Sequence, residues 1–562
     1  MKNTVRTNKP KVFIIGLDGA TFDIIHPLIE KGKLRNIARL MKNGSWGKLR
    51  STIPPLSPVA WTSFATGKNA GKHGIFDFLR REPDSYQMRF NNANSRCSKP
   101  IWALLSEAGK KVGIINVTMS YPPDKVNGLM ISGMDTPGDE SPFTYPLELY
   151  QEIKEKFGKY IFTTESGVPE DIDRETEKFI RGIHNEIKYR LNITEYLMQR
   201  NAWDFFVTIF LASDSVCHFC WKYTDINHPN YNPKMASKYA NVIDNVYEKL
   251  DDAVGKLADS VDEDTTVIIM SDHGFGPVYK VLYINRWLCD KGYLKFAEKS
   301  NYRRLHRVFS YVKRELKKVV PEQFVEKRKE LGRRKHKSQI MNPLYNVKWV
   351  ETKAFSEGTY GAIFINLKGR EPEGMVKPGS AYEQLRHQLI SDFMEVKDPE
   401  SGDSVVRKVY KTEEVFHGNY LDKAPDLLVE FNDGYDSVGK FNKDQLGIEL
   451  EGGCLYQLNN WSGNHRLDGI LITSGPLVRE LGEIKGAEII DIAPTVLYLM
   501  GLPVPKDMDG KVLREIIDDD YVNMNPITFT EDTKVDYRKD NNYSQDDEKR
   551  IEEMLRSLGY LA

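Results

Sequence analysis

The sequence predicts an α/β fold with a largely parallel central sheet, a helical basic insertion and a small cap-like region. Three observations support this prediction: short apolar runs that read as strands buried on both faces, helix-like segments between them, and acidic residues where strands end. Because the chain has 562 residues, we expect one large domain that carries insertions.

Five apolar runs are the expected strands. Each is short and continuous rather than alternating, which is typical of strands that helices cover on both faces. The runs are residues 12–17, 205–211, 266–270, 426–431 and 469–473.

Helical periodicity marks four further segments. Apolar residues recur at helical spacing in 175–198 and 382–393, the second of which follows a strand-like run at 362–367. Residues 491–500 begin with Asp491 as a capping residue and have Pro494 in the first turn. Residues 544–559 begin with a capping box and end at a glycine, so we expect a C-terminal helix.

We expect five parts along the chain, two of which belong to the same large domain. These parts are 1–295, the first part of the α/β domain; 296–345, the basic helical insertion; 346–450, an α/β continuation or cap; 451–515, the last part of the α/β domain; and 516–562, an acidic linker with the C-terminal helix.

Composition indicates an ordinary globular protein and, we expect, a cytoplasmic one. Hydrophobic residues make up 40%, charged residues 28%, and the net charge is −1. Five scattered cysteines, an odd number, favour reduced thiols over a disulfide framework. The apolar run at 12–17 is too short for a signal peptide, and no stretch reaches the roughly 18 apolar residues of a membrane span.

Three of the expected strands lead into an aspartate. Asp18 and Asp272 follow their strands closely, and Asp214 comes after Ala212 and Ser213. In open α/β sheets, ligands lie outside the carboxyl ends of the strands, so we expect the three carboxylates to meet at one crevice.

Histidines accompany these aspartates. Asp214 and His218 have i, i+4 spacing and would share one face of a helix, His273 directly follows Asp272, and His465 lies in an expected loop ahead of a strand. A lone aspartate at a strand end is usually a cap, but six such residues at successive strand ends are poorly explained that way. Carboxylate and imidazole ligands suit two divalent cations, with Zn²⁺ the first expectation and Mn²⁺ the second.

The loop at 54–63 offers a nucleophile. Ser57, Thr62 and Ser63 all carry a hydroxyl, and residue type and spacing do not choose among them.

The stretch from Ser57 through Thr66-Gly67 to 73–75 (His-Gly-Ile) resembles the nucleophile region of the type I phosphodiesterase/nucleotide pyrophosphatase family, within the alkaline phosphatase superfamily. In that family the nucleophile, a threonine or serine, lies nine residues before the threonine of the Thr-Gly pair, which implies Ser57. The resemblance covers residues 11 to about 515 and is greatest to a group of predicted phosphohydrolases/phosphomutases. It implies an alkaline-phosphatase-like three-layer sandwich.

The resemblance also implies a division of the candidate ligands between two cation sites. One site would comprise Asp18, Ser57, Asp272 and His273, and the other Asp214, His218 and His465. Two departures from related sequences bear on the substrate. Phe78 stands where nucleotide pyrophosphatases have an asparagine that holds a phosphoryl oxygen, which argues against nucleotide specificity. Val59 and Trp61 stand where sulfatases have proline and arginine, which argues against a sulfatase.

The expected activity is two-metal hydrolysis of a phosphodiester or phosphomonoester on a small phosphorylated substrate, through a phosphoserine at Ser57. Three aspartates and a serine alkoxide would balance the four positive charges of two divalent cations. A dianionic monoester would then need a further cation nearby, whereas a diester carries one negative charge. Candidates for that cation are Lys68, Lys72, Arg80 and Arg370.

Two other functions are compatible with the sequence. A phosphomutase would use the same metal centre and return the phosphoryl group to its substrate. A non-catalytic protein could bind anions, such as nucleic acid or anionic lipid, through the basic segment 302–338, although a solvated helical face explains that segment more simply. Cys217 and Cys220 form a Cys-x-x-Cys that we interpret as core packing, because no second cysteine pair accompanies it. Substrate identity and oligomeric state are left open.

Overall fold

A computed structural model of the chain describes residues 10–164, 173–296, 344, 347–438, 454–456, 461–532, 543–558 and 560. Its central element is a nine-stranded sheet. In spatial order the strands are β19 (Gly482–Glu488), β2 (Gly44–Arg50), β18 (Asp468–Ser474), β9 (Thr265–Met270), β1 (Lys11–Leu17), β8 (Phe205–Phe210), β5 (Val112–Val117), β6 (Gly128–Ser132) and β7 (Thr144–Tyr145). Only β18 and β7 run against the others, which confirms a largely parallel sheet.

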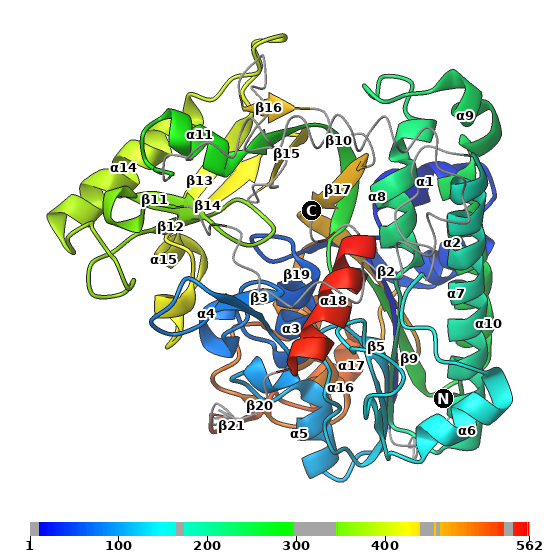
Figure 1. Ribbon diagram of the computed structural model, residues 1–562. Coiled ribbons are helices and arrows are strands. Elements are labelled where there is room, and N and C mark those ends of the chain that lie inside the picture. Colours follow the sequence, from blue (N-terminus) through cyan, green and yellow to red (C-terminus); the bar gives the residue numbers. More distant parts are fainter. Residues whose placement is uncertain are drawn as a thin grey trace.

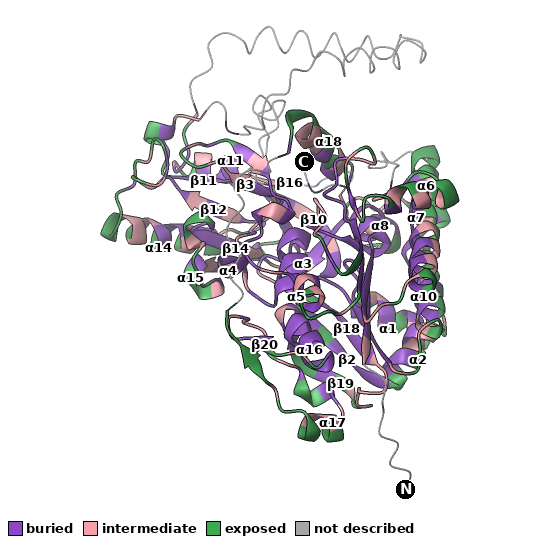
Figure 2. Cartoon of the chain, turned by 90° about the horizontal axis from the view of Figure 1, so that it is seen from below, coloured by how far each residue is buried: buried purple, intermediate pink, exposed green. Residues whose placement is uncertain are grey.

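Helices cover both faces of this sheet and give three layers (Figure 1). On one face lie α1 (Phe22–Glu30), α2 (Arg35–Lys42), α6 (Leu149–Phe157), α7 (Asp173–Arg200), α8 (Ala212–Thr224), α9 (Pro233–Tyr239) and α10 (Val242–Asp259). On the other lie α3 (Ser57–Thr66), α5 (Ile101–Glu107), α16 (Ile492–Leu499), α17 (Asp519–Met524) and α18 (Gln545–Ser557). Figure 2 shows the sheet buried between helices whose outer faces are exposed.

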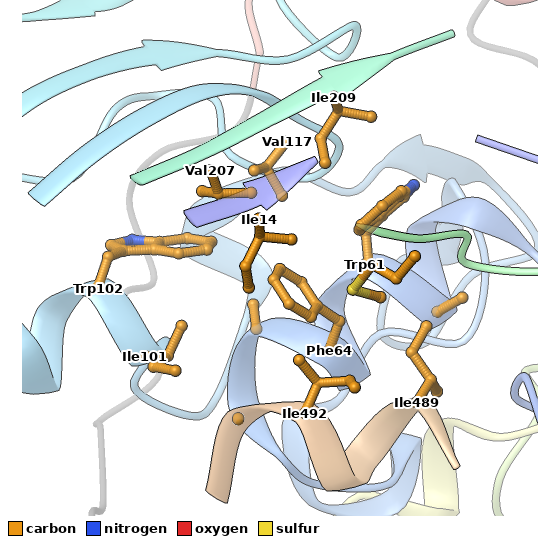
Figure 3. Packing of buried hydrophobic residues seen from close by; sticks show 14 of the residues in the cluster. Ile14, Trp61, Phe64, Ile101, Trp102, Val117, Val207, Ile209, Ile489 and Ile492 are labelled. Atoms are coloured by element: carbon orange, nitrogen blue, oxygen red, sulfur yellow. The ribbon is translucent and has the colours of Figure 1, made fainter. Parts of the chain in front are cut away.

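Alternation along β1 explains why the sheet has a hydrophobic core on each side. Val12 and Ile14 belong to the core under α3 and α16, whereas Phe13 and Ile15 belong to the core under α7 and α10. Successive side chains of a strand point to opposite faces, so a continuous apolar run contributes to both cores. Figure 3 shows Ile14 among the side chains of the first core.

A smaller antiparallel sheet forms a separate lobe, at the upper left of Figure 1. Its strands are β11 (Ala354–Ser356), β12 (Ala362–Ile365), β14 (Leu427–Phe431) and β13 (Val406–Lys411). Together with α14 (Ser380–Met394) and α11 (Ile284–Asp290), it encloses a third hydrophobic core. Most of the segment predicted as a continuation or cap therefore lies in this lobe.

A third sheet is built around β10 (Gly274–Tyr283), which follows β9 of the central sheet and ends at α11 of the lobe. β10 pairs with β15 (Gly434–Val438), β16 (Leu455–Tyr456) and β17 (Gly463–Arg466). The remaining strands among the described residues form two short pairs, β3 (Leu79–Arg81) with β4 (Met88–Phe90) and β20 (Val504–Pro505) with β21 (Phe529–Thr530). Short helices α4 (Ala70–His73) and α15 (Thr412–Val415) lie in connections.

The structure corrects two of the expected parallel strands. β14 belongs to the antiparallel lobe rather than to the central sheet, and β18 is in the central sheet but antiparallel to both neighbours. An apolar run indicates that a strand is buried. Which strand it pairs with, and in which direction it runs, depends on the segments that connect the strands and lie outside the run. The other three expected strands, β1, β8 and β9, are adjacent and parallel.

The four helix predictions are confirmed as α7, α14, α16 and α18. Cys217 and Cys220 are buried in the core beside α10, which confirms the packing interpretation. Apart from Phe296 and Leu344, the expected basic insertion lies outside the described residues. Among the described helices, none is both long enough and apolar enough to cross a bilayer.

Candidate metal centre

The carboxyl ends of β1, β8 and β9 bring the predicted acidic residues together. Asp18 follows β1, Asp272 and His273 lie between β9 and β10, and Asp214 and His218 stand on the first turns of α8, which begins just after β8. Since these strands are adjacent and parallel, their carboxyl ends share one edge of the sheet. All five side chains are buried there.

His465 reaches the same cluster from a strand rather than from the expected loop. It lies on β17, which pairs antiparallel with β10 and places His465 opposite Phe275. The sequence motif 463–465 (Gly-Asn-His) suggested a turn, but pairing with β10 makes it an extended segment. This pairing fixes the imidazole against residues more than 180 positions earlier in the chain.

Two overlapping groups of ligand atoms result, each lying within 4.8 Å. The first comprises Asp18, Asp272 and His273, whose Nε2 is 3.6 Å from Oδ1 of Asp18 and 3.3 Å from Oδ2 of Asp272. The second comprises Asp214, His465 and His273.

His218 adjoins the second group. Its Nε2 is 3.2 Å from Oδ1 of Asp214 and 3.1 Å from Nε2 of His465. The Oδ1 atom of Asp214 also lies 3.3 Å from His465 Nε2. The i, i+4 pair on α8 therefore faces one point, as the spacing predicted.

The three imidazoles are oriented in the same way. The Nδ1 atoms of His218, His273 and His465 lie 2.9, 2.9 and 2.8 Å from the backbone carbonyls of Gly463, Gly274 and Pro55. A carbonyl only accepts, so each Nδ1 carries the proton and each Nε2 turns a lone pair toward the cluster. Histidine ligands of metal ions are held in this way.

The cluster carries more buried negative charge than its protein contacts balance. Burial raises the pKa of Asp18 well above its usual range, and the neighbouring Asp272 and Asp214 raise it further. Burial and the Asp214 charge also raise the pKa of Asp272 to about 7.

Divalent cations fit this arrangement. Oδ1 of Asp18, Oδ1 of Asp214 and Oδ2 of Asp272 are buried without a hydrogen-bond partner. Burial lowers the pKa of His273, and it lowers that of His465 to about 3, so neither imidazole is a cation that could balance the carboxylates. Unpartnered carboxylate oxygens beside neutral imidazole lone pairs are the donor set that zinc and manganese accept.

Of the three candidate nucleophiles, only Ser57 faces the cluster. It is the first residue of α3, is fully buried, and has its Oγ 3.3 Å from Nε2 of His273. Thr62 donates to the carbonyl of Pro58, and Ser63 Oγ lies 3.0 Å from Nε2 of His73, away from the cluster. At the first turn of a helix, Ser57 also lies where unpaired amides favour negative charge.

Two side chains that the sequence did not identify as candidate site residues also contact the cluster. The Trp61 indole donates a 2.9 Å hydrogen bond to Oδ2 of Asp18. The Tyr560 hydroxyl donates a 3.0 Å hydrogen bond to Oδ2 of Asp214 and lies 3.4 Å from Ser57 Oγ. The i, i+4 spacing of Ser57 and Trp61 could have indicated that Trp61 lies near the cluster, since the two residues share one side of α3. No spacing relates Tyr560 to the other residues.

The four predicted substrate cations lie in two places. Lys68 and Lys72 lie beyond the far end of α3 from Ser57, where they pair with Asp507 and Asp509. Arg370 pairs with Asp426 and Glu371. Arg80 donates hydrogen bonds to the Phe90 carbonyl, Asn91 and Ser95. The structure thus does not bring the two lysines to Ser57.

Arg80 and Arg370 line a cavity of about 440 Å³ between the central domain and the antiparallel lobe. Leu56, the residue before Ser57, is part of its wall, and so are Phe76 and Phe416. A second cavity, of about 460 Å³, is lined by His465 and by the cationic side chains of Lys48, Arg50, Arg407 and Arg466. Both cavities include Pro54 and Tyr360, so they flank the loop that leads into Ser57.

The sequence profile of the family described as type I phosphodiesterase / nucleotide pyrophosphatase matches residues 12–465. This span contains Asp18, Ser57 and all of the other candidate ligands. No curated protein sequence matches the chain.

Solved structures also resemble this one. Phosphonoacetate hydrolase from Sinorhizobium meliloti 1021, in complex with phosphonoformate, has 13% identity and a TM-score of 0.52, over 87% of this chain and 95% of that chain. Murine ectonucleotide pyrophosphatase/phosphodiesterase 5 has 13% identity and a TM-score of 0.46, over 90% of this chain and 100% of that chain. The first similarity confirms the fold class expected from the sequence.

Proposed function

Because the chain belongs to the type I phosphodiesterase/nucleotide pyrophosphatase family, which indicates a hydrolase, we propose that it hydrolyses a phosphodiester with Ser57 as the nucleophile. One observation carries the proposal. The Ser57 hydroxyl lies at a helix N-terminus, 3.3 Å from His273, inside a cluster of three carboxylates and three imidazoles.

The cluster would hold two divalent cations, Zn²⁺ or Mn²⁺. When bound, they would supply Lewis-acid charge that favours an ionised serine and stabilises negative charge on phosphoryl oxygens. Asp18, Asp272 and His273 would hold one, and Asp214, His218 and His465 the other. The Nδ1 hydrogen bonds to backbone carbonyls keep the imidazoles in the orientation that this requires.

Ser57 would act in two steps. Its Oγ attacks phosphorus, the bond to the leaving alcohol breaks, and the phosphoryl group remains on Ser57. Water then attacks phosphorus and restores the serine. Overall, one phosphodiester and one water molecule are converted to an alcohol and a phosphomonoester.

Charge supports a diester over a monoester. Three aspartates and an ionised Ser57 would balance two divalent cations, so a monoanionic diester adds little net charge. Lys68 and Lys72, which could have balanced a dianion, are paired at the other end of α3. Among the described residues, the carboxylates of the cluster contact histidine, tryptophan, tyrosine and backbone groups rather than a lysine or arginine that could offset the second charge of a monoester.

The organic part of the substrate would occupy the cavity of about 440 Å³ beside Leu56. Its wall combines aromatic side chains with Arg80 and Arg370, which suits a ligand with an apolar body and an anionic group. Because this wall comes partly from the antiparallel lobe, the lobe would set substrate specificity.

The test compares bis(p-nitrophenyl) phosphate with p-nitrophenyl phosphate, with added zinc, added manganese or chelator. We expect turnover of the diester to exceed that of the monoester, to need metal, and to fall at least 1,000-fold in Ser57→Ala, since the nucleophile is removed. Ser63→Ala is the matched control, because its hydroxyl contacts His73 rather than the cluster. The proposal fails if Ser57→Ala and Ser63→Ala behave alike. Interconversion of sugar or glycerate phosphates without phosphate release would instead show a mutase.

A further inference from the structure

The end of the chain enters the metal cluster. The hydroxyl of Tyr560, 346 positions from Asp214, donates a 3.0 Å hydrogen bond to Oδ2 of that carboxylate. The same hydroxyl lies 3.4 Å from Ser57 Oγ. The Tyr560 side chain is 8% exposed, and its ring packs close to His218 and His465.

A docked helix positions this tyrosine. α18 contributes Ile551 and Leu555, and the residue after it Leu558, to the same hydrophobic core as α3. Just before the helix, the Tyr543 hydroxyl donates a 2.8 Å hydrogen bond to the carbonyl of Asp135. Glu548 forms a 2.8 Å ion pair with Arg89. The segment from Tyr543 to Leu558 is thus anchored to the rest of the domain just before Tyr560.

The Tyr560 ring also packs against Phe78, with ring centroids 5.1 Å apart. Phe78 occupies the sequence position at which nucleotide pyrophosphatases have an asparagine. An aromatic residue there gives the tyrosine ring an apolar surface to pack on. This contact, together with α18, leaves the hydroxyl pointing at Asp214.

The contacts of the two Asp214 carboxylate oxygens indicate the role of the Tyr560 hydroxyl. The Oδ1 atom of Asp214 lies 3.2 and 3.3 Å from the Nε2 atoms of His218 and His465 and has no hydrogen-bond partner. Its Oδ2 is occupied by Tyr560. The carboxylate therefore has one oxygen fixed by a neutral donor and the other presented to the imidazole lone pairs.

We propose that Tyr560 is a positioning residue of the metal centre, which orients Asp214 so that Oδ1 faces the cation held with His218 and His465. The inference rests on the proposed two-cation centre and adds to it a ligand-orienting group from the C-terminal tail. Because the hydroxyl is neutral, it fixes Asp214 without cancelling the charge that attracts the cation. Hydrogen bonds of this kind typically contribute about 10–100-fold to metal affinity.

Tyr560→Phe tests this role, since it removes the hydroxyl and keeps the ring. We expect the variant to bind one of two Zn²⁺ ions about 10–100-fold more weakly, measured by competition with a chromophoric chelator in the absence of substrate. The other ion should bind as in the wild type. The melting temperature of the metal-free protein should change little, because ring packing and α18 remain.

Tyr543→Phe is the matched control, as it removes a second buried phenol hydroxyl from the same tail but outside the cluster. It should bind both ions with wild-type affinity. Phe78→Leu, which removes the ring support of Tyr560, should weaken the same ion in the same direction by a smaller factor.

Two results would overturn the inference: wild-type zinc affinity in Tyr560→Phe, or equal losses of affinity in Tyr560→Phe and Tyr543→Phe. If the affinity is that of the wild type and esterase activity rises, the Tyr560 hydroxyl instead blocks the site. Failure of the proposed function is separate, because it would appear as activity that survives Ser57→Ala, whereas zinc affinity is measured without any substrate.

Discussion

The indole nitrogen of Trp61 donates a 2.9 Å hydrogen bond to Oδ2 of Asp18, which joins the hydrophobic core to the metal cluster. Trp61 is fully buried and meets the ring of Phe64 edge-on, with 5.5 Å between centroids. Figure 3 shows both side chains within the core. With Oδ2 held by the indole, Oδ1 of Asp18 is left facing His273. Core packing therefore selects the oxygen that Asp18 presents to a cation.

Trp61→Phe should weaken binding of one cation by about tenfold, because Asp18 loses the donor that orients it. Chelator competition in the absence of substrate measures this affinity. The control is Trp102→Phe, which removes an indole hydrogen bond of 2.8 Å to Asp124 from the same core but away from the cluster. Equal affinities in the two variants would contradict the prediction.

Asp272→Asn and His465→Asn should each reduce the bound zinc from two ions to one per chain. The first removes a charge from the group around Asp18, and the second removes an imidazole from the group around Asp214. Elemental analysis after equilibrium dialysis gives the stoichiometry. Retention of two ions by either variant would argue against the division of ligands proposed above.

Lys68→Met should lower stability and leave catalysis unchanged. Lys68 is 2% exposed and pairs with Asp507, which is partly exposed, so loss of the pair should cost about 1–3 kcal/mol. KM and kcat for a p-nitrophenyl ester should stay within about twofold of the wild type, because Lys68 lies past the far end of α3 from Ser57. A large rise in KM would instead place Lys68 in the substrate site.

His73 should make the protein less stable in acid. Burial is the main cause that lowers its pKa from 6.5 to about 3, and its Nδ1 accepts a hydrogen bond from the Ile75 amide, so the neutral ring is the folded form. On acidification, His73 takes up a proton in the unfolded chain before it does so in the folded protein. The contribution of His73 to stability is therefore present above about pH 6.5 and is lost as pH falls toward 3. Between pH 6.5 and 5, this single group should cost about 1–2 kcal/mol.

The check is chemical unfolding of His73→Asn and the wild type at pH 6.5 and 5, with chelator present. The asparagine oxygen can accept from Ile75 and does not titrate, so the variant should lose less stability on acidification. The exposed His387→Asn is the control and should follow the wild type. A variant whose acid sensitivity equals that of the wild type would rule out His73 as the group that titrates.

Much of the metal cluster could be predicted because it depends on local rules. Asp18 and Asp272 follow apolar strands that turned out to be adjacent and parallel, so their carboxyl ends share an edge. Asp214 and His218 are one helical turn apart, and that spacing alone places them on one face of α8. Such relationships involve a single element and the direction in which its strand runs.

Other features had no local signal. The antiparallel direction of β18 and the placement of β14 in the small lobe depend on pairings between distant segments. Tyr560 reaches Asp214 because α18, which precedes it, packs into the same core as α3, and Trp61 reaches Asp18 because α3 packs on β1. Each of these contacts spans more than 40 positions in the chain.

By itself, the sequence determined the α/β class, the strands that end in aspartate and the short set of hydroxyls that could act as the nucleophile. The tertiary structure alone decided which hydroxyl meets the cluster. Ser57, Thr62 and Ser63 share helix α3, where each residue turns the side chain by about 100°, so the three point in different directions. Only the packing of that helix against the sheet selects Ser57 as the hydroxyl that faces His273.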